Sequence, residues 1–368
     1  MMQKTAAVAM SGGVDSSVAA ALLKAQGYKV FGITMFFTSI PALRRSGYKR
    51  HLRQGLNDAR LVARKLGIRH YVFNATKALE EYVIRNFCRE YLKGRTPNPC
   101  VRCNEHIKFQ VLLKEALSSG ADFFATGHYA RVVKRPNLAL AKGEGITRGD
   151  YLLKKAKDQG KDQSYFLYRL TQDKLRRLIF PLGGYTKDEV RALADKFKLA
   201  VARKRDSQDI CFLPQGDYRV FLKDYLRLKI AGGPIVDEDG NVLGQHKGAF
   251  LYTVGQREGL GIARGYPVYI TRIDAAANKI TVGPRQEACK SAFLVKDINY
   301  ICGPLKKKVA LTVKIRYNHP DTPARVEPFD GKVMVKFKRP QFAVTPGQSA
   351  VFYNKDIVVG GGIIDEVL

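Results

Sequence analysis

The segment from Thr5 to Gly27 constrains the fold more than any other part of the sequence. A short apolar run, Thr5–Met10, has the character of a buried strand. The alanine- and leucine-rich run Val18–Gln26 favours a helix, which Gly27 would close with a left-handed cap. Between them, Ser11–Ser17 reads Ser-Gly-Gly-Val-Asp-Ser-Ser. A glycine turn between a strand and a helix start directs free backbone N–H groups at an anion, so we predict a phosphate cradle.

This cradle differs from two common nucleotide-binding loops. The chain contains neither a Gly-x-x-x-x-Gly-Lys-Ser/Thr motif nor the three-glycine dinucleotide spacing. The pattern Ser-Gly-Gly-x-Asp-Ser instead resembles the PP-loop of ATP pyrophosphatases, which split ATP between its α- and β-phosphates. That resemblance implies ATP as cofactor, with Asp15 beside Mg²⁺. A simple Gly-Ser turn before a helix is the alternative.

The charge of the chain predicts its partner. Among 368 residues, 63 are basic and 33 acidic, which leaves a net charge of +30. An excess spread along the chain indicates a polyanion, and we expect nucleic acid. A membrane surface is less suitable, because no long amphipathic helix is evident and no apolar run reaches the ~18 residues of a span. Without a secretion pattern or dense cysteine spacing, we expect a cytoplasmic protein, by default a monomer.

Element patterns predict an α/β fold in several parts. Alternating strands and helices indicate a Rossmann-like parallel-sheet PP-loop domain over residues 1–150, or to about 210. A central, mixed but helix-rich domain follows at 151–231, then a small β domain at 232–300 and a C-terminal antiparallel β-barrel at 301–368. The strands and helices predicted in the first domain are Lys29–Phe36, His70–Asn74, Asp122–Tyr129, Asp58–Leu66, Lys77–Leu92 and Asn104–Ser118. Gly127 to Tyr129 end one strand and are expected near the nucleotide.

Cys103 is the first candidate nucleophile. It lies in Arg95-Thr-Pro-Asn-Pro-Cys-Val-Arg-Cys-Asn104, where Asn104 is a plausible N-cap. A helix N-terminus and the neighbouring Arg102 would both lower the pKa of this thiol. A half-site for zinc, with Cys100 and His106, is the alternative.

Cys211 is the second cysteine of interest. It lies in the polar segment Arg205–Phe212, just before a predicted helix, so its thiol is expected to be accessible. By itself it carries little weight, because a lone cysteine is usually structural.

Seven motifs in order make the resemblance specific. They are the PP-loop, Thr96-Pro-Asn-Pro-Cys-x-x-Cys-Asn104, Gly127-His-Tyr-Ala-Arg131, Lys161-Asp-Gln-Ser-Tyr-Phe-Leu167, Asp206-Ser-x-x-Ile-Cys-Phe212, Tyr252-Thr-Val-Gly-Gln-Arg257 and Thr345-Pro-Gly-Gln348. Together they resemble the tRNA-specific 2-thiouridylase family over essentially the whole chain. That family replaces the C2 oxygen of the wobble uridine of tRNA with sulfur.

The resemblance implies a role for each matching residue. Cys211 would carry a persulfide, and Cys103 would add to the activated base or resolve the persulfide by forming a disulfide. The partners implied are tRNAs for Lys, Glu and Gln and a cysteine desulfurase or sulfur-relay protein. ATP would be held by Ala9, Met10, Ser11, Gly12, Gly13, Val14, Asp15, Ser16, Met35 and Gly127. The tRNA would be held by Asn98, Pro99, Cys100, His128, Lys161, Asp162, Gln163, Arg316, Tyr317 and Gln348.

One stretch departs from the family pattern. Between Phe36 and Gln54 the family usually has a tryptophan and acidic residues, whereas this chain has Arg44, Arg45, Lys49, Arg50 and Arg53 and no tryptophan. Two other functions remain open from the residues alone. One is a PP-loop ligase with a small carboxylate or carbonyl substrate, and the other is an RNA-binding protein without catalysis.

Overall fold

A computed structural model describes residues 3–37, 48–135, 149–205, 210–213, 217–227 and 231–368. The chain divides into two compact units. The first unit comprises Met1–Val83, Cys100–Phe221 and Asp356–Val358, and the second comprises Ile84–Pro99, Leu222–Lys355 and Val359–Leu368. The four-part division by residue range stays a prediction. The overall class is α/β, with a parallel-sheet domain and β domains, as predicted.

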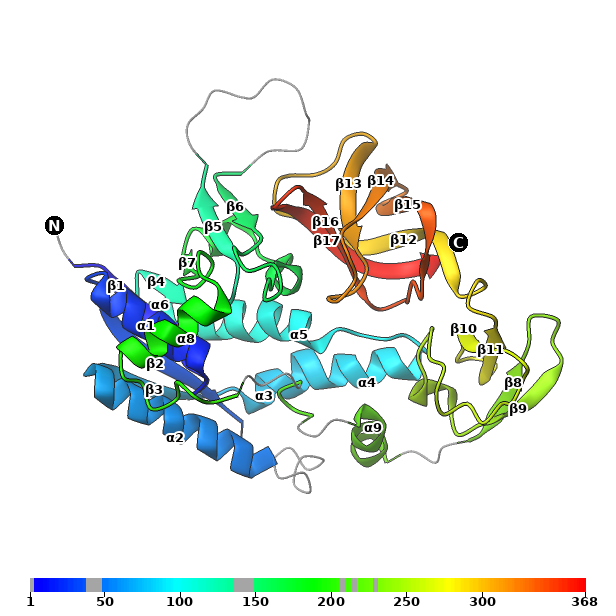
Figure 1. Ribbon diagram of the computed structural model, residues 1–368, viewed down its shortest axis with the longest axis horizontal. Coiled ribbons are helices and arrows are strands. Elements are labelled where there is room, and N and C mark those ends of the chain that lie inside the picture. Colours follow the sequence, from blue (N-terminus) through cyan, green and yellow to red (C-terminus); the bar gives the residue numbers. More distant parts are fainter. Residues whose placement is uncertain (1–2, 38–47, 136–148, 206–209, 214–216, 228–230) are drawn as a thin grey trace. The chain divides into compact units, whose positions relative to one another are not determined.

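The first unit is built on a parallel sheet (Figure 1). Among the described residues its strand order is β3-β2-β1-β4-β7. The strands are β1 Thr5–Ala9, β2 Lys29–Phe36, β3 Arg69–Asn74, β4 Phe123–Ala125 and β7 Leu178–Ile179. The chain proceeds from β1 to one side and later returns to the other through β4. The carboxyl ends of β1 and β4 therefore flank the point where the strand order reverses, which is where such sheets bind ligands.

Helices and a hairpin complete the α/β region. The α-helices are α1 Val14–Ala25, α2 Tyr48–Leu66, α3 Thr76–Ala78, α5 Pro99–Arg102, α6 Leu113–Ser118, α7 Gln172–Leu175 and α8 Lys187–Lys196. Two π-helical segments, η2 Leu79–Ile84 and η3 Cys103–Leu112, and the 3₁₀ turn η4 Ser164–Leu167 are also present. Strands β5 Arg131–Lys134 and β6 Tyr151–Lys154 form an antiparallel hairpin. The α-helix α9, Tyr218–Leu226, follows α8 along the chain.

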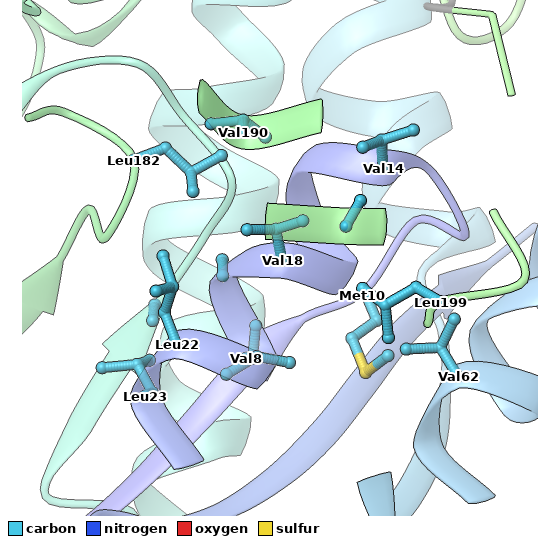
Figure 2. Close-up of a cluster of buried hydrophobic side chains, with 14 of the residues drawn as sticks. Val8, Met10, Val14, Val18, Leu22, Leu23, Val62, Leu182, Val190 and Leu199 are labelled. Atoms are coloured by element: carbon cyan, nitrogen blue, oxygen red, sulfur yellow. The ribbon is translucent and has the colours of Figure 1, made fainter. Parts of the chain in front are cut away.

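Helix α1 lies in the core of this unit. Figure 2 shows its side chains Val14, Val18 and Leu22 in one cluster with Val8 of β1 and Val190 of α8. Each aliphatic side chain removed from water in this way contributes roughly 1.5–3 kcal/mol. The helix begins at Val14, a turn earlier than the predicted Val18. It ends as predicted, because Gly27 adopts φ +87° and its N–H donates to the Lys24 carbonyl.

The predicted helix Asn104–Ser118 is not a regular α-helix. Helix α5 begins earlier, at Pro99, and η3 interrupts the α-helical hydrogen bonding from Cys103. Phe109 departs from helical geometry, with φ −102° and ψ 15°. The residue types favour helix in either form, so the sequence pattern does not distinguish an α-helix from a π-helix. Such π-helical segments are frequent at functional sites.

The second unit opens with α4 and a small sheet. Helix α4 spans Arg85–Leu92. Four strands follow in the order β10-β11-β8-β9, with bounds β8 Gly233–Val236, β9 Val242–His246, β10 Tyr269–Asp274 and β11 Lys279–Gly283. A short 3₁₀ turn, η5 Ala249–Leu251, packs beneath them. Strands β8 and β11 pair parallel, whereas the alternating runs favoured antiparallel pairing throughout. Strand polarity across a non-sequential pair depends on the connections and not on alternation.

The C-terminal strands close on themselves as an antiparallel barrel. Over residues 289–367, all described, the order is β12-β15-β14-β13-β16-β17, and β17 pairs back with β12. The bounds are β12 Cys289–Tyr300, β13 Val309–Lys314, β14 Thr322–Phe329, β15 Lys332–Phe342, β16 Ser349–Asn354 and β17 Ile357–Val367. The turn Asp330-Gly331 joins β14 to β15, with φ +43° and +68°. Closure covers the edges that β12 and β17 would otherwise leave free.

In the part of the chain that the structure describes, no helix is long and apolar enough to cross a bilayer.

Candidate active site

The glycine loop follows β1 directly. Gly12 adopts φ +75°, and a Cβ placed on it would lie 2.1 Å from the Gly55 carbonyl oxygen of α2. Only glycine therefore fits at this position, both for its backbone conformation and for the approach of α2. No sequence pattern indicates that α2 approaches the loop this closely.

Serine hydroxyls brace this loop from within. The Ser17 hydroxyl is buried and donates to the Gly13 carbonyl at 2.8 Å. The Ser16 hydroxyl oxygen accepts from the Ser11 N–H at 3.2 Å. Gly13 at the N-cap has no side chain, so no side chain caps the first turn of α1. The amide groups there suit an anionic ligand.

Asp15 is the charged centre of the loop. Its Oδ1 accepts from the Tyr129 hydroxyl at 2.8 Å and from the Lys187 Nζ at 2.7 Å. No group of three or more His, Cys, Asp or Glu side chains suited to a metal occurs among the described residues. Mg²⁺ is commonly held by one or two carboxylates together with substrate phosphates, so Asp15 fits as one such ligand.

The end of β4 meets the loop as the sequence predicts. A Cβ on Gly127 would lie 2.7 Å from the Ser16 nitrogen, so glycine allows the two backbones to touch. Tyr129, also expected near the nucleotide, reaches Asp15 as described above. Met35 is half-buried near the carboxyl end of β2. The Met10 carbonyl accepts from the Thr34 hydroxyl at 2.6 Å, which fixes β2 against the start of the loop.

The two cysteines singled out from the sequence meet in the first unit. Cys103 begins η3 and is 6% exposed, whereas Cys211 is an exposed residue. Their thiols are hydrogen-bonded to each other, and both are free cysteines. Cys100 lies on the preceding turn and is half-buried.

The hydrogen bond between Cys103 and Cys211 shifts the pKa values of their thiols in opposite directions. The hydrogen bond from Cys211 lowers the pKa of Cys103 to about 7; burial opposes this shift, and the charge of Lys108 adds to it. The same hydrogen bond raises the pKa of Cys211 well above its ordinary value. Burial also raises the pKa of Cys100, to about 11. A thiolate therefore forms more readily on Cys103 than on Cys211.

The predicted N-cap beside Cys103 is wrong. Asn104 is not an N-cap, because the helix begins at Pro99, a residue well tolerated at a first helical position. Asn104 instead donates from Nδ2 to the Phe166 carbonyl at 3.1 Å. The Arg102 guanidinium pairs with Glu105 at 3.3 Å, and the cation that acts on Cys103 is Lys108.

Glu105 organises the charges behind Cys103. Its Oε1 accepts from Arg169 Nη2 at 2.7 Å, and its Oε2 lies 3.3 Å from His106 Nε2. Burial would raise the pKa of Glu105, but the neighbouring His106 ring and hydrogen bonds from Arg169 lower it to about 2. The carboxylate thus stays ionised and holds Arg169 in place.

Several residues expected to touch tRNA are buried in the first unit. His128 is 8% exposed, its Nδ1 lies 2.6 Å from the Thr126 hydroxyl, and burial lowers its pKa well below the usual range. Asp162 is buried and accepts from the Ala156 N–H at 2.9 Å. Gln163 Oε1 accepts from the Tyr129 N–H at 3.0 Å, and Lys161 is half-buried beside it.

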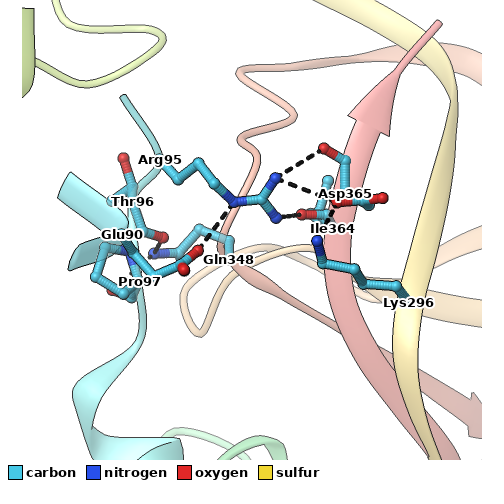
Figure 3. A network of polar contacts seen from close by, with 8 residues as sticks. All are labelled: Glu90, Arg95, Thr96, Pro97, Lys296, Gln348, Ile364 and Asp365. Atoms are coloured by element: carbon cyan, nitrogen blue, oxygen red, sulfur yellow. Dashed lines mark hydrogen bonds and ion pairs between the residues drawn. The ribbon is translucent and has the colours of Figure 1, made fainter. Parts of the chain in front are cut away.

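The remaining expected tRNA residues belong to the second unit, apart from Cys100. Gln348 Nε2 donates to the Thr96 carbonyl at 3.0 Å, so it holds the backbone that leads to Asn98 and Pro99 (Figure 3). Arg316 Nη1 donates to the Phe342 carbonyl at 3.0 Å. The Lys314 ammonium lies 5.8 Å from the centre of the Tyr317 ring. Asn98 is half-buried and Pro99 is buried.

Two predicted features fall outside the described residues. They are Asp206 to Asp209 of the Cys211 motif and Arg44 and Arg45 of the basic stretch. The side chains of Lys49 and Arg50 are likewise not described, and Arg53 is exposed.

Lys187 and Lys204 were missed by the sequence analysis. Lys204 Nζ donates to the Gly12 carbonyl at 3.0 Å and pairs with Asp58 at 2.6 Å. One signal was available for Lys187, since it follows the N-cap Thr186 at the start of α8, where acidic side chains are the favoured ones. No comparable signal marks Lys204.

Comparison with protein families agrees with this architecture. Residues 4–215 match the family model described as tRNA methyl transferase HUP domain. Residues 219–284 match the tRNA methyl transferase PRC-barrel domain, and residues 290–364 match the aminomethyltransferase beta-barrel domain.

Full-length relatives define the family more closely. The tRNA-specific 2-thiouridylase MnmA of Halothermothrix orenii is 49% identical over 98% of both chains. That of Carboxydothermus hydrogenoformans is 47% identical over 100% of this chain and 99% of its own. A solved 4-thiouridine synthetase–RNA complex with bound ATP is 19% identical, covers 57% of this chain and 45% of its own, and has a TM-score of 0.36.

The fold and the site define an enzyme with a PP-loop α/β domain followed by two β domains. Within that class, the chain belongs to the tRNA-specific 2-thiouridylase family. The resemblance that its ordered motifs indicated is confirmed.

Proposed function

We propose that this enzyme replaces the C2 oxygen of the wobble uridine of tRNA with sulfur, using ATP. The observation that carries the proposal is the hydrogen-bonded pair of Cys103 and Cys211 in the same unit as the PP-loop. The charge of Lys108 lowers the pKa of both thiols and also that of His128, the neighbour of Gly127. One lysine therefore influences both the cysteine pair and the proposed ATP site. Membership of the family supports the same reaction.

ATP first activates the base. The C2 oxygen of the uracil attacks the α-phosphorus, the bond to the β-phosphate breaks, and pyrophosphate leaves with the electron pair. The loop amides of Gly13 and Val14 would stabilise the phosphates, and Asp15 would help to hold Mg²⁺, which shields their charge. The oxygen then leaves as part of AMP.

Sulfur transfer uses the unequal thiols. Cys211 accepts a sulfane sulfur as a persulfide, and the terminal sulfur forms a bond to C2 as AMP departs. The Cys103 thiolate attacks the inner sulfur of Cys211, so the persulfide S–S bond breaks with its electron pair on the transferred sulfur. The product is 2-thiouridine, and the two cysteines are left as a disulfide that an external thiol reduces. The low pKa of Cys103 supports its role as the resolving thiolate.

The partners follow from charge and family. The net charge of +30 supports salt-sensitive binding of tRNA. We propose Asn98, Pro99 and Cys100 as contacts of the extruded uracil, since a stacked base hides its C2 edge. tRNAs for Lys, Glu and Gln are the proposed substrates, and a cysteine desulfurase or sulfur-relay protein is the proposed donor, in the cytoplasm.

The test combines ATP, unmodified tRNA, cysteine and a cysteine desulfurase and measures 2-thiouridine and AMP together. We expect one AMP for each thiouridine, and no thiouridine from Cys103→Ser or Cys211→Ser, both of which keep tRNA binding. Cys289→Ser is the matched control and should be fully active. Full thiolation by either variant would overturn that residue's role. AMP release without tRNA would favour a small-substrate ligase, and tRNA binding without AMP would favour a non-catalytic RNA-binding protein.

A further inference from the structure

The glycine loop has no cation of its own. Residues 9–17 contain no lysine or arginine, unlike the lysine-bearing nucleotide loop. Backbone amides alone leave most of the charge of a polyphosphate unmatched. The structure supplies lysines to this loop from far along the chain.

Lys187 is the better placed of these lysines. Its side chain is 10% exposed, and its Nζ lies 2.7 Å from Asp15 Oδ1, at the second residue of α1. A buried ammonium group needs an anionic partner, because desolvation otherwise disfavours the charge. The anionic partner of Lys187 is Asp15, which belongs to the proposed phosphate site itself. The Tyr129 hydroxyl donates to the same oxygen and fixes its position.

The backbone around Lys187 is already satisfied. Thr186 and Glu189 form a reciprocal capping box at the start of α8, and the Lys187 N–H donates to Asp158 at 2.9 Å. The start of α8 is therefore closed to a ligand, and what α8 contributes is the side chain of Lys187. A cation at the first position of a helix opposes the helix dipole, so local helix stability does not explain it.

Lys204 increases the positive potential at the same loop. Its Nζ donates to the Gly12 carbonyl and pairs with Asp58. This contact holds the backbone of the loop, whereas Lys187 contacts a side chain at the helix start. A phosphate can therefore compete with Asp15 for the Lys187 ammonium, whereas the Lys204 ammonium holds the loop backbone.

We propose that Lys187 binds the β- and γ-phosphates of ATP, the part that leaves as pyrophosphate. Asp15 holds the ammonium at the mouth of the loop, and the polyphosphate, which carries more negative charge than one carboxylate, competes for it. This inference rests on the proposed use of ATP. The alternative is a purely structural counter-ion for Asp15.

Binding of ATP and of AMP separates these two roles. Dissociation constants are measured by calorimetry at fixed Mg²⁺ for wild type and Lys187→Met. Loss of a charge-assisted hydrogen bond should weaken ATP binding on the order of 10- to 100-fold and leave AMP binding within about twofold. Lys187→Arg should recover part of the ATP affinity. An equal loss for both nucleotides, or no loss for ATP, would overturn the proposal.

Lys157→Met is the matched control. Lys157 pairs at 2.8 Å with Glu189, which lies in α8 as Lys187 does, but the Lys157 side chain is 52% exposed. Its removal should change neither affinity. If wild type itself binds no ATP, the proposed function fails; if wild type binds ATP and Lys187→Met binds it equally well, only this inference fails.

A second comparison remains decisive if Lys187→Met does not fold. The double variant with Asp15→Asn and Lys187→Met leaves no unpaired charge at the site. Its affinity for ATP is compared with that of the single variant Asp15→Asn. We expect the double variant to bind ATP about 10-fold more weakly than Asp15→Asn. Equal affinities would assign Lys187 to a structural role.

Discussion

The thiol of Cys103 is hydrogen-bonded to the thiol of Cys211, a residue that lies far along the chain and on a different segment of the first unit. The contact gives the two sulfurs opposite acidities, so that one is suited to attack and the other to carry sulfur. It therefore links the fold to the proposed chemistry.

Removing the hydrogen bond should raise the pKa of Cys103. With Cys211→Ala, burial dominates, and we expect the pKa to move from about 7 to at least the ordinary thiol value of about 8.5. Cys211→Ser keeps a donor and should give a smaller shift. The pH dependence of Cys103 alkylation, followed by mass spectrometry, measures this shift. Cys289→Ser is the control, and an unchanged profile in Cys211→Ala contradicts the assignment.

Gly12→Ala should destabilise the first unit strongly. An alanine there faces both a positive φ and the Gly55 carbonyl, so we expect a loss of about 3 kcal/mol or more in unfolding free energy. Gly27→Ala is the matched control, because its φ is +87° but nothing lies near its Cβ. That variant should lose only about 1–2 kcal/mol. Urea unfolding, with hydrogen exchange in α1, measures the difference; similar losses would mean that α2 does not restrict the loop.

Asp365→Asn should lower the stability of the barrel in a pH-dependent way. Partial burial would raise the pKa of Asp365, but hydrogen bonds from Lys296 and Lys332 lower it to about 2. Figure 3 shows the Lys296 contact. Since the folded pKa lies below the unfolded value of about 3.9, the stabilisation is complete above that value and is lost as pH falls towards 2.

After allowance for solvent screening of this partly exposed site, we expect a loss of about 1 kcal/mol at pH 6, shrinking as pH approaches 3. Unfolding free energies of both proteins across this pH range test the prediction. Asp330→Asn, at an exposed turn, should show no such trend. A loss independent of pH would show that the charge of Asp365 is not responsible.

Gln348→Ala should loosen the segment that leads to Cys100. Gln348 donates to the Thr96 carbonyl, and the Thr96 N–H donates to the Pro346 carbonyl. We expect faster hydrogen exchange over residues 95–98, with the barrel unchanged. Gln341→Ala removes contacts to the Arg339 carbonyl and to the His319 ring, neither of which touches residues 95–98, and is the control. If Gln348 serves tRNA binding alone, exchange in this segment will not change.

Much of the fold was predictable because its signals are local. Strand Lys29–Phe36 follows from its apolar run, and the cap at Gly27 and the turn at Asp330-Gly331 follow from residues that tolerate positive φ. The π-helical form of η3 was not, because its residues favour any helix. The start of that helix was misplaced at Asn104, since Asn is a common N-cap and Pro99 is tolerated at a first helical position.

The sequence by itself determined the type of protein and identified the glycine loop and the two cysteines. Loop chemistry and motif order depend on neighbouring residues, and a single chain displays both. Only the tertiary structure decided which groups act on one another: Lys187 on Asp15, Lys108 and Cys211 on Cys103, and Gln348 on Thr96. These pairings join residues far apart along the chain, and their strength depends on burial and distance, which arise only when the chain is packed.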